Sequence, residues 1–261
     1  MRVNVGSLSI GGDEFTLIAG PCSLESQSHF LNVAQEVRQR GASFLRGGLF
    51  KLRTHPNSFQ GLGTEAYSIA RQVKEQVGLP FVSEITDPRQ IGDMMDVVDV
   101  FQVGSRNMYN YPLLKELGTL NKPILLKRGL SALIKEWLLA AEYITQGGNE
   151  QVILCERGIR SFETATRNTF DINAIAYIKR YTSFPIIADP SHGTGNKDLV
   201  ASVACAAAAA GCDGVMVEVH PEPEKALSDG FQALDLPQFS RLVDQLDQLL
   251  PVFGRRLAKP Q

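Results

Sequence analysis

The sequence predicts an α/β protein built as a single closed (β/α)8 barrel of the TIM type, preceded by a short β-hairpin. About eight times along the chain, a short apolar or β-branched run is followed by a polar or Gly/Pro-rich loop and then by an amphipathic helical pattern. Most of these runs are almost continuously apolar, which is typical of parallel strands covered on both faces. The length of 261 residues suits one closed barrel better than an open sheet.

The expected strands are short apolar runs, each of which stops at a polar, glycine or proline residue. Residues 1–15 alternate weakly in polarity around Gly11 and Gly12, so we expect them to form the hairpin. The barrel strands are expected at 16–19, 43–46, 81–85, 100–103, 123–127, 152–156, 185–188 and 214–219.

The expected helices occupy the amphipathic stretches between these strands. They lie at 26–40, 63–76, directly after Pro88, and at 112–117, 131–145, 172–179, 197–210 and 237–250. Residues 253–261 are read as a polar tail. Because no linker or shift of composition divides the chain, residues 16–261 are expected to form one catalytic barrel without an appended regulatory domain.

Composition limits the classes of partner and location. The formal net charge is −2, so nothing draws the whole protein toward nucleic acid or an anionic membrane. The longest apolar stretch, 199–210, falls short of the roughly 20 residues of a membrane helix, and residues 1–15 lack the apolar core of a signal peptide. The four cysteines show no framework spacing, so a reducing, cytoplasmic setting is expected.

Cationic side chains gather at the carboxyl ends of the expected strands, where TIM barrels carry their catalytic groups. The richest stretch is 46–61, which contains no acidic residue. The cations are Arg46, Lys51, Arg53, Arg106, Lys127 and Arg157. Their number suggests a ligand with two phosphates or with a phosphate and a carboxylate. In the alternative, they form a solvated basic loop, and some pair with Glu84, Glu156 or Asp189.

A second set of strand-end residues suits a divalent metal. Cys22, His192, Glu218 and Asp229 combine thiolate, imidazole and carboxylate donors, a set that favours Mn, Fe, Co or Zn over Mg or Ca. Cys22 could instead be a small core residue, and His192 a loop residue bonded to backbone. His220 is the rival imidazole.

Eight motifs at these strand ends resemble those of the 3-deoxy-7-phosphoheptulonate (DAHP) synthases of class I, β type. The motifs are IAGPCSLES (18–26), RGGLFKLRTHPNSFQG (46–61), SEITDP (83–88), QVGSRNMYN (102–110), LLKRG (125–129), ILCERGIRSFE (153–163), IADPSHGTG (187–195) and VEVHPEPEKALSDG (217–230). Together they cover nearly the whole chain.

The resemblance implies a transferase that condenses phosphoenolpyruvate with erythrose 4-phosphate, using one divalent metal, at the head of the shikimate pathway. Its metal ligands correspond to Cys22, His192, Glu218 and Asp229, which selects His192 over His220. The implied substrate-binding residues are Arg46, Lys51, Arg53, Thr54, Ser105, Arg106, Arg157 and Asp189. Glu84 would orient water, and Lys127 or His192 would move protons. The resemblance also implies that the chain forms a homotetramer.

Two residues depart from the family pattern in the loop that usually reads KPRTS. Here Leu52 stands in the proline position and His55 in the serine position. Because that serine helps to hold the phosphate of the acceptor sugar, the change bears on acceptor identity rather than on reaction type. The alternatives are a 3-deoxy-manno-octulosonate 8-phosphate synthase that uses arabinose 5-phosphate, and a barrel that binds phosphorylated metabolites without turnover.

Overall fold

The expected barrel is confirmed in a computed structural model that describes residues 1–50, 57, 59 and 61–259. Eight parallel strands pair in chain order, and the last pairs with the first through the register Gly214↔Thr16 to Glu218↔Gly20, which closes the ring. The strands are β3 (Glu14–Gly20), β4 (Phe44–Arg46), β5 (Phe81–Ile85), β6 (Val100–Val103), β7 (Ile124–Lys127), β8 (Val152–Glu156), β9 (Ile186–Ala188) and β10 (Gly214–Glu218).

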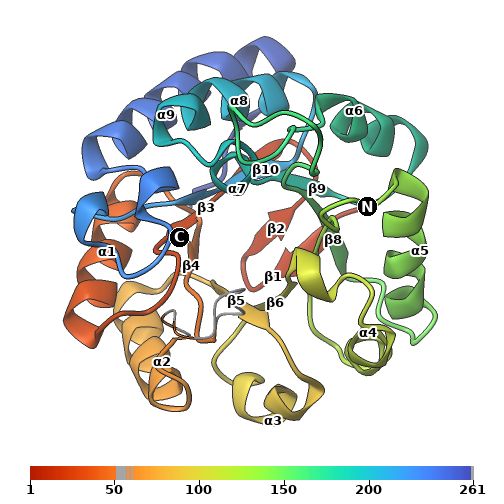
Figure 1. Ribbon diagram of the computed structural model, residues 1–261, viewed down its shortest axis with the longest axis horizontal. Coiled ribbons are helices and arrows are strands. Elements are labelled where there is room, and N and C mark those ends of the chain that lie inside the picture. The colour runs from red at the N-terminus through yellow and green to blue at the C-terminus, as the bar shows by residue number, and fades with distance from the viewer. Residues whose placement is uncertain (51–56, 58, 60, 260–261) are drawn as a thin grey trace.

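Helices surround the ring and cover its outer face (Figure 1). They are α1 (Gln27–Gln39), α2 (Glu65–Val77), α3 (Ile91–Met94), α4 (Tyr111–Gly118), α5 (Ile134–Thr145), α6 (Ile172–Tyr181), α8 (Lys197–Ala209) and α9 (Leu236–Leu249). Local chemistry sets several boundaries. The Ser26 side chain accepts from the His29 N–H at the start of α1, and Gly78 ends α2 in the left-handed conformation.

The N-terminal hairpin lies within the ring in projection (Figure 1) and fills the amino-terminal end of the barrel. Its antiparallel strands are β1 (Val3–Val5) and β2 (Leu8–Ile10). Four apolar side chains of the hairpin are buried in one cluster with an inward-facing residue of each barrel strand, namely Ile18, Phe44, Val82, Val100, Leu125, Ile153, Ile187 and Met216. The barrel is therefore closed at this end.

Two segments differ from the sequence-based expectation. The polar tail contains a short strand, β11 (Arg256–Leu257), which pairs in parallel with the start of β3 and buries Leu257. The segment expected to be a loop after β9 contains a helical turn, α7 (Pro190–Thr194), capped by the Asp189 carboxylate. For the tail, a partner strand far away in the chain supplies hydrogen bonds that the local sequence does not predict.

Within the described ranges, none of the helices has both the length and the apolar character that crossing a bilayer requires.

Candidate active site

One cavity of about 430 Å³ opens among the carboxyl ends of the strands. Nine of the predicted site residues line it: Cys22, Arg46, Glu84, Ser105, Arg106, Lys127, Arg157, His192 and Asp229. Asp189 and Glu218 lie fully buried behind this lining and contact it. The other predicted residues, Lys51, Arg53 and Thr54, lie outside the described residues, as do Leu52 and His55.

The four predicted metal ligands come together at one side of this cavity. Donor atoms of Cys22, Glu218 and Asp229 all lie within 4.8 Å of one another, and Cys22 Sγ is 3.4 Å from Asp229 Oδ2. His192 Nε2 lies 3.4 Å from Glu218 Oε1. One thiol, one imidazole and two carboxylates at these separations fit a borderline divalent metal.

Asp229 reaches this group through an unusual backbone conformation. Its φ of 51° makes it the one non-glycine residue with positive φ in the described part of the chain. A non-glycine residue held in this region carries strain that the surrounding structure must offset, a feature that gathers at functional sites.

Glu218 makes hydrogen bonds with three residues, although its side chain is inaccessible to solvent. Arg46 Nη1 donates to Oε1 at 2.8 Å, Gln232 Nε2 donates to Oε2 at 2.8 Å, and the Glu218 N–H donates to Ser191 Oγ at 3.0 Å. Although burial alone would lower the pKa of Arg46, the carboxylate of Glu218 raises it above its ordinary value. The buried carboxylate is therefore compensated and fixed in orientation.

Asp189 joins the two residues predicted to move protons. Lys127 Nζ donates to Oδ2 at 2.5 Å, and His192 Nδ1 lies 2.8 Å from the same oxygen. Burial tends to raise the pKa of Asp189, but the neighbouring His192 and Lys127 hold it well below its usual range. Burial lowers the pKa of His192 to about 4 despite the attraction of Asp189, so the ring is neutral near pH 7. A neutral imidazole is the form that ligates a metal.

The cations of the cavity differ in how their charge is compensated. Lys127 pairs with Asp189, as the alternative interpretation predicted for part of the set, and Arg46 pairs with Glu218, which that interpretation did not include. Arg157 is 4% exposed and lines the cavity, and burial lowers its pKa below the ordinary value. Burial of a guanidinium in this position favours an anion as its neighbour.

Glu156 does not line the cavity, because its carboxylate accepts hydrogen bonds from other protein groups. Arg128 Nη1 donates to Glu156 Oε2 at 2.9 Å and to Asp171 Oδ2 at 2.9 Å, and the Gly158 N–H donates to Glu156 Oε1 at 2.7 Å. The triad ties β8 to the start of α6, which fixes the strand end that carries Arg157.

Sequence reasoning missed several residues at the site. Arg160, Arg167 and Asn168 come from the loop after β8 and line the cavity. Gln232 is fully buried, and its Oε1 accepts from Arg167 Nη1 at 2.6 Å. The basic residues after ILCERG were a usable signal, since loops that follow barrel strands build such sites. Nothing in the local sequence marks Gln232.

His220, the rival imidazole, belongs to a different cluster. Its ring lies beside Glu25 and His29, and ligand atoms of the three residues are within 4.8 Å of one another. His192, by contrast, contacts Glu218 directly.

Comparisons with known proteins agree with the geometry. Residues 2–251 match the model of the DAHP synthetase I family. The chain is 46% identical over 252 residues to the phospho-2-dehydro-3-deoxyheptonate aldolase of Thermotoga maritima, covering 97% of this chain and 75% of that protein. It is 31% identical over 265 residues to a 2-dehydro-3-deoxyphosphooctonate aldolase of Nitrobacter winogradskyi, covering 94% of this chain and 91% of that protein.

Two solved structures from Thermotoga maritima superpose on nearly the whole chain. The DAHP synthase matches with a TM-score of 0.96 and 44% identity over 99% of this chain and 76% of that chain. A truncated form of 3-deoxy-D-arabino-heptulosonate 7-phosphate synthase matches with a TM-score of 0.92 and 41% identity, covering 99% and 95% of the two chains.

Proposed function

Since the chain belongs to the DAHP synthetase I family, we propose that it condenses phosphoenolpyruvate with erythrose 4-phosphate and water, giving DAHP and phosphate. This would place it at the first step of the shikimate pathway. The observation that carries the proposal is the meeting, at one cavity, of a four-donor metal group with the buried cations Arg46, Lys127 and Arg157. Neither feature alone would specify this reaction.

The cations suit the carboxylate and phosphate of phosphoenolpyruvate. We assign Arg46, Arg106, Lys127 and Arg157 to this substrate, with Ser105 close by and Lys51 contributing from outside the described residues. Guanidinium groups bind carboxylate and phosphate oxygens in bidentate fashion, which fixes orientation as well as position. The same groups would hold the leaving phosphate, so their contribution is proximity and electrostatic stabilisation.

Cys22, His192, Glu218 and Asp229 would hold the metal. When bound, it supplies Lewis acidity that polarises the acceptor aldehyde toward attack by the enol carbon. Gln232 and Arg46 hold the Glu218 carboxylate in place. Of the metals that suit this donor set, Mn, Fe, Co and Zn are candidates.

Three polar residues would manage water and protons. Glu84 lines the cavity and would orient the water that adds to C2. Lys127 and His192 both contact one oxygen of Asp189, so a proton taken up by either would be stabilised by the same carboxylate. This shared contact makes both candidates for proton transfer and assigns Asp189 as the group that positions them.

Acceptor identity rests on residues 51–55, with Arg53 and Thr54 proposed to hold the phosphate of erythrose 4-phosphate. The 46% identity to the heptonate enzyme exceeds the 31% identity to the octonate enzyme, which favours the four-carbon acceptor. Arabinose 5-phosphate remains the competing acceptor, and binding without turnover the competing function.

The test is phosphate release from phosphoenolpyruvate by purified protein, with either sugar phosphate, after chelation and after Mn²⁺ is returned. We expect turnover with erythrose 4-phosphate that chelation abolishes and Mn²⁺ restores. Turnover with arabinose 5-phosphate alone would reassign the acceptor. Bound metal without turnover on either sugar would favour the binding protein. Asp229→Asn supplies the matched variant, in which Mn²⁺ should no longer restore activity at the same concentration.

Two further properties are proposed from the family. We expect a homotetramer in a cytoplasmic setting. Light scattering on the purified chain gives its mass in solution, and a monomer would contradict the expectation.

A further inference from the structure

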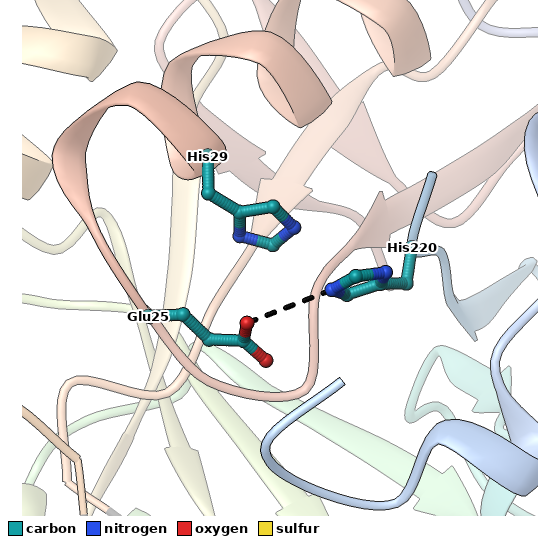
Figure 2. Close-up of side chains that lie close together, drawn as sticks. All are labelled: Glu25, His29 and His220. Carbon is teal, nitrogen blue, oxygen red and sulfur yellow. Dashed lines mark ion pairs between the residues drawn. The ribbon is translucent and has the colours of Figure 1, made fainter. Parts of the chain in front are cut away.

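We propose that Glu25, His29 and His220 form a second divalent metal site, separate from the catalytic group and suited to zinc. The three residues come from two parts of the chain. Glu25 lies just before α1, His29 lies in its first turn, and His220 follows β10. Figure 2 shows the three side chains converging on a common space. A pair of imidazoles with one carboxylate is a donor set used for zinc and for non-haem iron.

Unsatisfied nitrogen atoms are the observation that points to a ligand. Both ring nitrogens of His29 and Nε2 of His220 are buried and, among the residues the structure describes, accept or donate no hydrogen bond. A buried polar atom without a partner costs free energy on the order of 1–3 kcal/mol, so such atoms are uncommon and usually face an ion or water. One of these atoms, His220 Nε2, lies 3.6 Å from the Glu25 carboxylate, and the His29 ring offers one nitrogen to the same group of ligand atoms.

The separations leave room for an ion but not for direct hydrogen bonds. His220 Nε2 and Glu25 Oε2 are 3.6 Å apart (Figure 2), and the two imidazole centroids are 4.4 Å apart with planes inclined by 33°. Metal–ligand bonds of about 2.0–2.2 Å place neighbouring ligand atoms of a tetrahedral site roughly 3.3–3.5 Å apart. All donor atoms already lie within 4.8 Å of one another, so small side-chain rotations complete the set.

The surroundings orient the carboxylate and keep one imidazole in its ligating form. The Leu227 N–H donates to Glu25 Oε1 at 2.9 Å, which leaves Oε2 directed at the histidines. Burial, with a smaller contribution from His220, lowers the pKa of His29 below its ordinary value. The lowered pKa favours the neutral ring, which is the form that ligates a metal.

Metal binding requires one local change. His220 Nδ1 accepts from the Glu222 N–H at 3.0 Å, so in the metal-free ring the proton resides on Nε2. Ligation through Nε2 moves this proton to Nδ1 and releases the Glu222 amide. We therefore expect amide hydrogen exchange at Glu222 to become faster when zinc binds.

The site would hold together the two loops that carry Cys22 and Asp229, two of the proposed ligands of the catalytic metal. One loop follows β3 and the other follows β10. Side chains of the two loops already meet at Cys22–Asp229 and Ser23–Ser228, and the Leu227 backbone N–H donates to the Glu25 carboxylate. His220 adds a fourth contact through Glu25. A metal at this position would stabilise the contacts between the two loops. It would lie outside the cavity, because none of its three ligands lines that cavity.

The first experiment is equilibrium dialysis against Zn²⁺ with metal analysis of the unmodified chain, His29→Gln and Asn32→Gln. Asn32 is an exposed residue of the same helix and serves as the matched control. We expect two zinc ions per chain for the unmodified protein and the control, and one for His29→Gln. Equal zinc content in all three would overturn the proposal. If only the catalytic assignment were wrong, the unmodified chain would bind one ion and His29→Gln none.

The second experiment uses Co²⁺ as a spectroscopic probe in the Cys22→Ser background, where the catalytic group offers no thiolate. Introducing His29→Cys then places a thiol at the proposed site. We expect a near-ultraviolet charge-transfer band on adding Co²⁺ to the double variant and none with Cys22→Ser alone. Absence of the band from a folded double variant would contradict ligation at residue 29.

Discussion

Gln232 and Glu218 form a hydrogen bond of 2.8 Å between Nε2 and Oε2, with both side chains fully buried. The other end of the same amide accepts from Arg167, a residue of the cavity lining. One glutamine thus connects a proposed metal ligand to a basic residue of the cavity lining. This contact defines the role of Gln232 as positioning, since it reaches the chemistry only through its neighbours.

Gln232→Leu should weaken metal binding while leaving the fold intact. Groups that orient metal ligands typically contribute about 10- to 100-fold in metal affinity. We therefore expect the Mn²⁺ concentration for half-maximal activity to rise by about that factor, with less change in the rate at saturating Mn²⁺. The exposed Gln248→Leu is the control. An unchanged Mn²⁺ requirement in Gln232→Leu would show that Arg46 alone orients Glu218.

Lys127→Met should lower both the turnover rate and the free energy of unfolding. It leaves the Asp189 carboxylate buried without its ammonium partner, and breaking one side of a buried pair costs about 3–5 kcal/mol in unfolding free energy. The matched surface pair joins Lys197 Nζ and Glu224 Oε1 at 3.5 Å, and exposed pairs contribute about 0–1 kcal/mol. Urea unfolding of Lys127→Met and Lys197→Met compares them. Equal losses would contradict the burial argument.

Gly104→Ala should displace Glu84 without straining the backbone. A Cβ at Gly104 would lie 2.0 Å from Glu84 Oε1, and Gly104 itself has the extended conformation that alanine adopts freely. Since Glu84 is proposed to orient water, we expect turnover to fall about 10- to 100-fold, as misplacement of about 1 Å does in other active sites. Gly92→Ala, which meets nothing within 4 Å, is the control and should retain full turnover.

Ile10→Ala should destabilise the barrel without altering the site. Ile10 is inaccessible to solvent in the cluster at the amino-terminal end, and truncating such a side chain costs about 2–5 kcal/mol. Thermal or urea unfolding measures the loss, and Val252→Ala, 76% exposed, should change stability by less than about 0.5 kcal/mol. Turnover per folded molecule should be the same in both. A stable Ile10→Ala would show that the hairpin is dispensable for closing the barrel.

Sequence alone predicted the strands because each is a nearly uninterrupted apolar run. It also predicted that residues at the strand ends would line one cavity, because barrel topology brings strand ends together. The choice of His192 over His220 needed the family motif, since spacing carries no information on which ring faces the cavity. Contacts between segments far apart in the chain could not be predicted from the sequence. The pairing of Lys127 with Asp189, the burial of Gln232 and the strand at Arg256–Leu257 all depend on neighbours far away in the chain.

Both ends of the described chain lie at the closed end of the barrel. A Cβ at Gly11 would approach both the Met1 carbonyl and Pro185, the residue before β9, which places Met1 near the start of that strand. Leu257 pairs with Phe15 at the start of β3. An affinity tag or surface tether attached at either end should therefore leave the cavity at the opposite end of the barrel facing the solution. Protein immobilised in this way should keep its cavity open to both proposed substrates.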